Sequence, residues 1–186
     1  MRRDEQTAVF QTGLLSQPLP LEYAAGDSLL AISFKPGVFV PRAPGIAMLN
    51  RVLERPLVGT RAFAMDGETL EIPTFENADA LVQCLVRKGL LVQDELVASA
   101  TRGHPRAISQ RSVQRHFLRA IGMTPKQFEQ IQRACRAVEL LRGGMAPAAV
   151  ALETGYADQS HLTRGLKSIM GRTPAAILRA GRGAGP

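Results

Sequence analysis

The sequence predicts a mainly α-helical protein in which two helix-turn-helix units are joined by a long helix and preceded by a small β-rich or mixed N-terminal region. Three observations predict this fold class. The tetrapeptide Gly122-Met123-Thr124-Pro125 returns 49 residues later as Gly171-Arg172-Thr173-Pro174. Apolar residues at helical spacing precede both copies, and the positive charge is concentrated in the half of the chain that holds them.

The two copies match in role along their whole length. Each indicates a helix N-cap, apolar anchors, an arginine on the opposite face, a glycine stop, and a Thr-Pro start for the next helix. Two short helices built alike predict two readers of one repetitive ligand. Superposing residues 109–125 on 158–174 pairs Ser109 with Asp158, Val113 with Leu162, Arg115 with Arg164, Phe117 with Leu166 and Ile121 with Met170.

The N-terminal region, residues 1–76, is interrupted by prolines that exclude long helices. The apolar run from Ser28 to Phe34 predicts a strand, and residues 46–53 predict a brief helix. From Asn77 the apolar spacing becomes helical, so residues 77–93 are expected to form a linker helix. A further helix is expected over 94–102.

The first copy of the repeat predicts a helix over 110–121, with Ser109 as its N-cap and Gly122 as its stop. Thr124 and Pro125 then begin the long helix, which is expected to run to Arg142. Its buried stripe is predicted to contain Phe128, Ile131, Cys135, Val138 and Leu141.

The second copy predicts a complete helix-turn-helix. Pro147 begins a short helix, Ala151 allows a close helix approach, and Gly155 supplies a left-handed turn residue. Asp158 then caps a helix over 159–170. Residues 94–180 are therefore expected to form one domain, followed by a flexible tail over 181–186.

Charge separates the two halves of the chain. Residues 1–94 carry 9 Lys and Arg against 11 Asp and Glu, whereas residues 95–186 carry 14 against 5. The basic half is expected to bind a polyanion, with a merely solvated basic surface as the alternative.

Several function classes are not supported by the sequence. No apolar run reaches the roughly 20 residues of a membrane span, and the N-terminus lacks the apolar core of a signal peptide, so a cytoplasmic protein without a membrane partner is expected. Neither the three histidines nor the two cysteines stand at metal-ligand spacing. No nucleophile elbow or phosphate loop occurs, so we expect no enzyme, metal or cofactor.

Double-stranded DNA is the polyanion that this arrangement predicts. A recognition helix fits the major groove, and successive grooves on one face of the duplex lie about 34 Å apart. A helix of 18 residues is about 27 Å long, a suitable scale for joining two readers. Predicted base contacts are Arg111, Gln114, Arg115, Ser160, His161 and Arg164, and predicted phosphate contacts are Arg119, Thr163, Lys167 and Arg172.

Each of these side chains has an alternative interpretation. Arg111, Arg115 and Arg164 could be solvated surface residues, and His161 could be exposed by chance. Tyr156 is interpreted as a turn-packing aromatic rather than a base-stacking one.

The same residues resemble a known family. The segment Gly155-Tyr156-Ala157-Asp158-Gln159-Ser160-His161-Leu162-Thr163-Arg164, with Lys167, Gly171 and Thr173-Pro174 after it, resembles the second helix-turn-helix of AraC/XylS-type transcriptional regulators. Residues 109–117, with Gly122 and Thr124-Pro125, resemble the family's first recognition helix. The resemblance covers about residues 94–180 and implies a homeodomain-like double helix-turn-helix that binds promoter DNA and recruits or blocks RNA polymerase.

Two departures from the family pattern shape the remaining expectations. The approach to the first recognition helix, residues 101–108, is short and contains Pro105. Residues 1–76 are too few for the family's β-barrel sensor, although residues 30–37 are similar to a segment near its end. We therefore expect a shortened sensor without a complete effector pocket. The alternative function is a helical interaction module, or an antagonist of a related regulator with weakened DNA binding.

Overall fold

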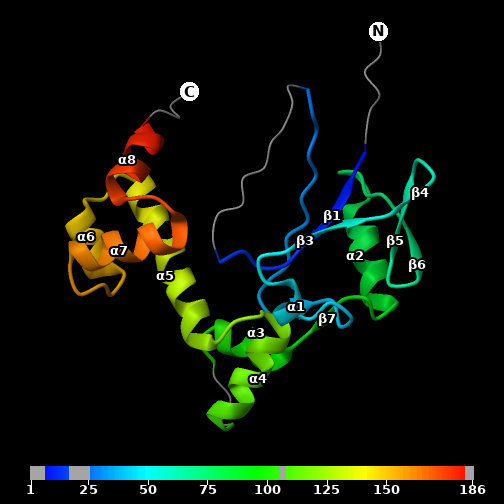
Figure 1. The fold of residues 1–186 in the computed structure, drawn as a ribbon, viewed down its shortest axis with the longest axis horizontal. Coiled ribbons are helices and arrows are strands. Elements are labelled where there is room, and N and C mark those ends of the chain that lie inside the picture. The colour runs from blue at the N-terminus through cyan, green and yellow to red at the C-terminus, as the bar shows by residue number, and fades with distance from the viewer. Residues whose placement is uncertain (1–6, 17–25, 105–107, 183–186) are drawn as a thin grey trace. The chain divides into compact units, whose positions relative to one another are not determined.

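A computed structural model describes residues 7–16, 26–104 and 108–182 and divides the chain into two compact units (Figure 1). The main part of unit 1 ends at Met123, and the main part of unit 2 begins at Thr124. This boundary falls inside residues 94–180, so the domain division expected from the sequence stays a prediction. Of the flexible tail expected over 181–186, residues 181 and 182 belong to a helix, and residues 183–186 lie outside the described residues.

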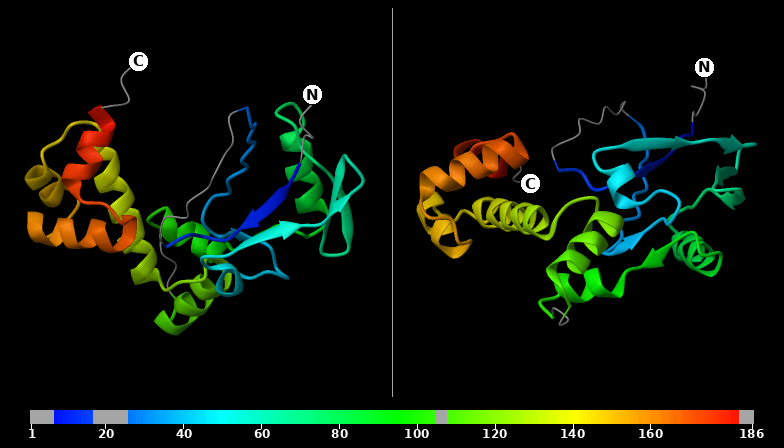
Figure 2. Two further views of the ribbon diagram at one scale, coloured as in Figure 1. Left: turned by 45° about the horizontal axis from the view of Figure 1, so that its top comes forward. Right: turned by 60° about the horizontal axis from the view of Figure 1, so that its bottom comes forward.

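Unit 1 contains short antiparallel strands (Figure 2). Strand β1 (Val9–Thr12) pairs with β3 (Val52–Arg55), and β2 (Val38–Phe39) pairs with β7 (Val92–Gln93). A meander follows β3, and its last turn contains Asp66 and Gly67, both with positive φ as a tight hairpin requires. The strands of the meander are β4 (Leu57–Val58), β5 (Ala62–Met65) and β6 (Glu68–Glu71).

Four helices complete unit 1: α1 (Gly45–Met48), α2 (Ala78–Arg87), α3 (Glu95–Thr101) and α4 (Gln110–Ala120). Helix α2 buries Leu85 in a core with residues of the meander. Helices α1 and α3 both pack against α4. The core that includes Leu85 also contains Val40, Phe63, Met65, Leu70, Leu90 and Leu91.

One prediction for the N-terminal region is wrong, and another holds only in part. Residues 28–34 form no strand, and most of them are exposed. An apolar run forms a strand only where a partner satisfies its backbone, and no ladder reaches these residues. The helix expected over 46–53 ends at Met48, because Asn50 takes a left-handed conformation and Val52 begins β3.

Unit 2 is helical, and the ends of α5 and α7 agree with the sequence prediction. It contains α5 (Pro125–Arg142), α6 (Pro147–Glu153), α7 (Gln159–Met170) and α8 (Pro174–Arg182). Its core contains Val150, Ala151, Leu162, Leu166 and Ile177.

The buried face of α5 is only partly as predicted. Phe128 and Leu141 are buried, but Cys135 is exposed, and Ala134 and Ala137 lie in the core instead. Large apolar side chains predict the stripe from the sequence, whereas close contact with α6, α7 and α8 requires small residues on the inner face.

Candidate nucleic-acid interface

Helix α7 is fixed at both ends by local interactions. The Asp158 carboxylate accepts a hydrogen bond of 2.6 Å from the backbone N–H of His161, and Gly171 ends the helix with a φ of 66°. Leu162 and Leu166 are fully buried on one face. The opposite face presents Ser160, Arg164 and Lys167, whose spacing of four and three residues keeps them on one stripe.

Helix α6 and the turn after it place α7 against the core. Val150 and Ala151 are buried, and the Thr154 hydroxyl donates to the Val150 carbonyl at 2.5 Å. Gly155 has a φ of 74°, and the backbone N–H of Tyr156 donates to the Ala151 carbonyl at 2.9 Å. Residues 147–170 thus form a helix-turn-helix.

Tyr156 holds this turn to its neighbours, as its interpretation as a turn-packing residue predicts. The side chain is buried, and burial raises the pKa of its hydroxyl, while the charge of Arg133 lowers it. The Arg133 guanidinium carbon lies 5.7 Å from the centroid of the ring, and the imidazole of His161 meets the ring edge-on at 5.1 Å.

Helix α4, in unit 1, presents a basic face like that of α7. Ser109 caps the helix through the backbone N–H of Ser112 at 3.3 Å. Phe117 and Ala120 are buried, whereas Arg111, Gln114 and Arg115 are exposed. Neither α4 nor α7 contains an acidic residue, so no carboxylate within either helix offsets these cations.

Helix α3 stands before α4 and ends in the same way as α6. Its Val97 and Ala98 are buried, Gly103 has a φ of 80°, and the N–H of His104 donates to the Ser99 carbonyl at 3.0 Å. This likeness is not evident from the sequence, because the segment between α3 and α4 is longer than the segment between α6 and α7. Pro105, which was expected to compress this approach, lies outside the described residues.

The structure separates the predicted site residues into two groups. Arg111, Gln114, Arg115, Ser160, Arg164, Lys167 and Arg172 are exposed. Three have local partners: His161 Nδ1 accepts from the N–H of Ala157 at 3.3 Å, the half-buried Thr163 donates to the Gln159 carbonyl at 2.8 Å, and the Arg119 guanidinium carbon lies 5.4 Å from the centroid of the Phe39 ring. Arg111, Gln114, Arg115 and Arg119 belong to unit 1, and the rest belong to unit 2.

A shallow hollow lies on the exposed side of α7. It is lined by Gln159, Ser160, Thr163 and Arg164. The lining is formed by hydroxyl, amide and guanidinium groups, which donate hydrogen bonds.

Comparison with known proteins identifies this region. A protein-family profile described as a helix-turn-helix domain matches residues 106–180. Residues 106–180 are an AraC-type helix-turn-helix domain. The chain is also similar to the HTH-type transcriptional regulator RipA of Corynebacterium glutamicum, with 33% identity over 78 residues. The matched segment is 42% of this chain and 24% of that protein, so the chain spans about a quarter of the relative's length.

No solved structure gives a significant match to the chain. Among the described residues, no helix is long and apolar enough for a membrane crossing. In the same described part of the chain, no group of three or more His, Cys, Asp or Glu side chains could hold a metal ion.

Proposed function

We propose that the protein is a sequence-specific DNA-binding transcriptional regulator that recruits or blocks RNA polymerase. The observation that carries the proposal is the exposed face of α7, where Ser160, Arg164 and Lys167 form one stripe opposite the buried Leu162 and Leu166. Arginine pairs with the O6 and N7 atoms of guanine, and lysine binds phosphate as a point charge. Similarity to a named transcriptional regulator supports the same function.

We further propose that α4 and α7 read two successive major grooves. In this proposal Arg111, Gln114, Arg115, Ser160 and Arg164 contact bases, and Lys167 and Arg172 contact phosphates. Support comes from the α3–α4 pair, because α3 ends as α6 does and packs on α4 as a scaffold helix packs on its recognition helix. The 18 residues of α5 span about 27 Å, comparable with one turn of DNA.

The local contacts suggest narrower roles for three residues. His161 has one ring nitrogen occupied by Ala157, so only Nε2 is left for a base. The hydroxyl hydrogen of Thr163 is directed at the helix backbone, which leaves this side chain only its acceptor capacity. Arg119 lies over Phe39, and a phosphate contact from it must compete with that packing.

Selection from a random duplex library, followed by binding at several salt concentrations, tests the proposal. A regulator enriches a preferred site and shows a log–log salt slope of about −0.9 per phosphate neutralised. Absence of both enrichment and salt slope would overturn the proposal and favour an interaction module.

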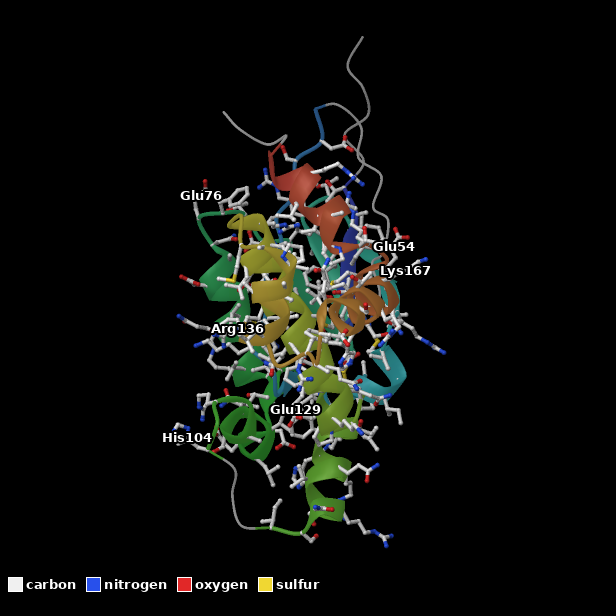
Figure 3. The ribbon with its side chains drawn as sticks, turned by 90° about the vertical axis from the view of Figure 1, so that its left-hand side faces the viewer. Glu54, Glu76, His104, Glu129, Arg136 and Lys167 are labelled. Atoms are coloured by element: carbon white, nitrogen blue, oxygen red, sulfur yellow. The ribbon has the colours of Figure 1, made fainter. Side chains whose placement is uncertain are left out.

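A pair of matched variants separates a defined interface from general charge. Lys167→Ala and Arg136→Ala each remove one positive charge. Lys167 lies on the proposed reading face. Arg136 pairs with Glu153 at 3.3 Å and lies on the other side of unit 2 in Figure 3. Only Lys167→Ala is expected to reduce the salt slope, by about 1. Equal reductions would point to non-specific attraction.

A further inference from the structure

One short N-terminal segment, residues 37–48, contacts the start of α3 and the end of α4, and Asp94, whose N–H bonds to this segment, also contacts the middle of α4. All three contacts lie within unit 1. The N-terminal segment therefore packs directly against α4 and against α3, the helix that supports it.

The first contact joins the segment to the start of α3. Strand β2 pairs with β7, and the N–H of Asp94 donates to the Gly37 carbonyl at 2.8 Å. Gly37 has a φ of 97°, and a β-carbon there would stand 3.0 Å from the backbone nitrogen of Ala98. The segment and the first turn of α3 are therefore held backbone to backbone.

The second contact continues from Asp94 to α4. One carboxylate oxygen of Asp94 caps α3 by accepting from the N–H groups of Leu96 and Val97, and the other lies 2.7 Å from His116 Nδ1. The Asp94 side chain is only 7% exposed, which shields this interaction from solvent. A single carboxylate thus ties the start of α3 to the middle of α4.

The third contact lies at the end of α4. A β-carbon on Gly45 would stand 2.5 Å from the carbonyl carbon of Ile121, and one on Gly122 would stand 2.6 Å from the carbonyl carbon of Gly45. Real side chains do not reach such distances, so the backbones of α1 and the α4 terminus meet directly. Gly122 also has a φ of 89°, which favours glycine independently.

We propose that residues 37–48 position the first reading helix, with Gly45 and the Asp94–His116 pair as positioning residues, so that the N-terminal region sets the affinity for the DNA half-site that α4 reads. This inference rests on the proposed function. None of these residues lies on the exposed Arg111, Gln114 and Arg115 face, so each acts through the placement of α4.

The first test measures α4 without DNA. Amide hydrogen exchange of the full chain is compared for wild type, His116→Ala and His116→Asn. Alanine has the higher helix propensity but removes the ring nitrogen, whereas asparagine places an N–H close to the position of Nδ1. For His116→Ala we expect amide exchange in α4 to be about tenfold faster, the factor that 1.4 kcal/mol represents. In His116→Asn the exchange rate in α4 should return toward that of wild type. Exchange in α7 should be unchanged in both variants. Unchanged α4 exchange in His116→Ala would overturn the proposal.

The second test measures protection of the DNA site selected from the library. The half-site that loses protection in Arg115→Ala is assigned to α4, and the one that loses protection in Arg164→Ala is assigned to α7. Gly45→Ala and His116→Ala are expected to weaken protection of the α4 half-site about tenfold and to leave the α7 half-site unchanged. Gly143→Ala is the control, because Gly143 has a φ of −70° and its β-carbon would meet only ordinary contacts. If Gly45→Ala does not fold, His116→Ala decides.

The outcomes distinguish this inference from the proposed function. If wild type selects no site, the proposed function fails, and hydrogen exchange of α4 in Gly45→Ala and in His116→Ala decides whether Gly45 and the Asp94–His116 pair position α4. If wild type protects both half-sites and the variants weaken neither or both equally, the positioning inference fails while the DNA-binding function stands.

Discussion

The ring of Tyr156 lies over Gly165 so closely that a β-carbon on Gly165 would stand 2.8 Å from its Cε1 atom. Tyr156 follows the turn after α6, and Gly165 lies in the middle of α7. The aromatic ring therefore occupies the space that any other residue at position 165 would fill. This contact sets how closely α7 approaches the turn that precedes it.

Gly165→Ala is expected to destabilise unit 2, because the added methyl group must displace a buried ring that also contacts Arg133 and His161. Overpacking of this kind costs about 1–3 kcal/mol, measurable by urea unfolding. Gly143→Ala is the matched control, since its backbone suits alanine and a gain of about 0.4–1 kcal/mol is expected. A stability for Gly165→Ala equal to that of Gly143→Ala would show that the ring moves freely.

Asp158→Ala is expected to lower the free energy of unfolding by about 1 kcal/mol, because the N–H of His161 loses its cap. Asp158→Asn keeps an acceptor oxygen at the same place and should retain most of the stability. The same urea unfolding experiment compares the three proteins. Equal losses in both variants would assign the effect to the negative charge near the helix N-terminus rather than to the hydrogen bond.

The helices of unit 2 could be predicted from the sequence because local chemistry sets their ends. Thr124 forms a capping box with Gln127, Asp158 caps α7, and Gly171 ends it in a left-handed conformation. Each signal involves residues within four positions of each other. The exposed faces of α4 and α7 could be predicted for the same reason, since helical spacing alone separates Leu162 from Arg164.

The features that sequence reasoning missed depend on contacts between distant residues. The sequence around Cys135 does not show that Cys135 faces outward and Ala134 inward, because that orientation depends on the packing of α5 against the other helices of unit 2. The approach of Gly45 to Gly122 joins residues 77 positions apart. The position of His161 on α7 predicts a base contact, but Nδ1 of its ring accepts from the N–H of Ala157 in the turn before the helix. That base contact stays a prediction.

Cys135 is expected to react slowly with iodoacetamide although it is exposed. Desolvation raises the pKa of its thiol, and the neighbouring Glu139 raises it further. The thiolate is the reactive form, so a raised pKa lowers the reactive fraction at pH 8 and extends the rise in rate beyond about pH 8.5, the pKa of an ordinary thiol. Alkylation rates of a Cys84→Ser protein, compared with free N-acetylcysteine, check this. A rate that levels off below that pH would contradict the raised pKa.

Arg164→Ala is expected to relax sequence preference at one base pair and to weaken binding by roughly 1–3 kcal/mol, because an arginine that reads guanine contributes only where guanine is present. Lys167→Ala is expected to weaken binding to all sequences alike, since a phosphate contact carries no base information. Both residues lie on the exposed stripe of α7, so their comparison holds the helix constant. Binding to the selected site and to its single-base variants at fixed salt measures both effects. A uniform loss on every sequence from Arg164→Ala would assign that side chain to the phosphates and leave the reading of bases by α7 to Ser160 and His161.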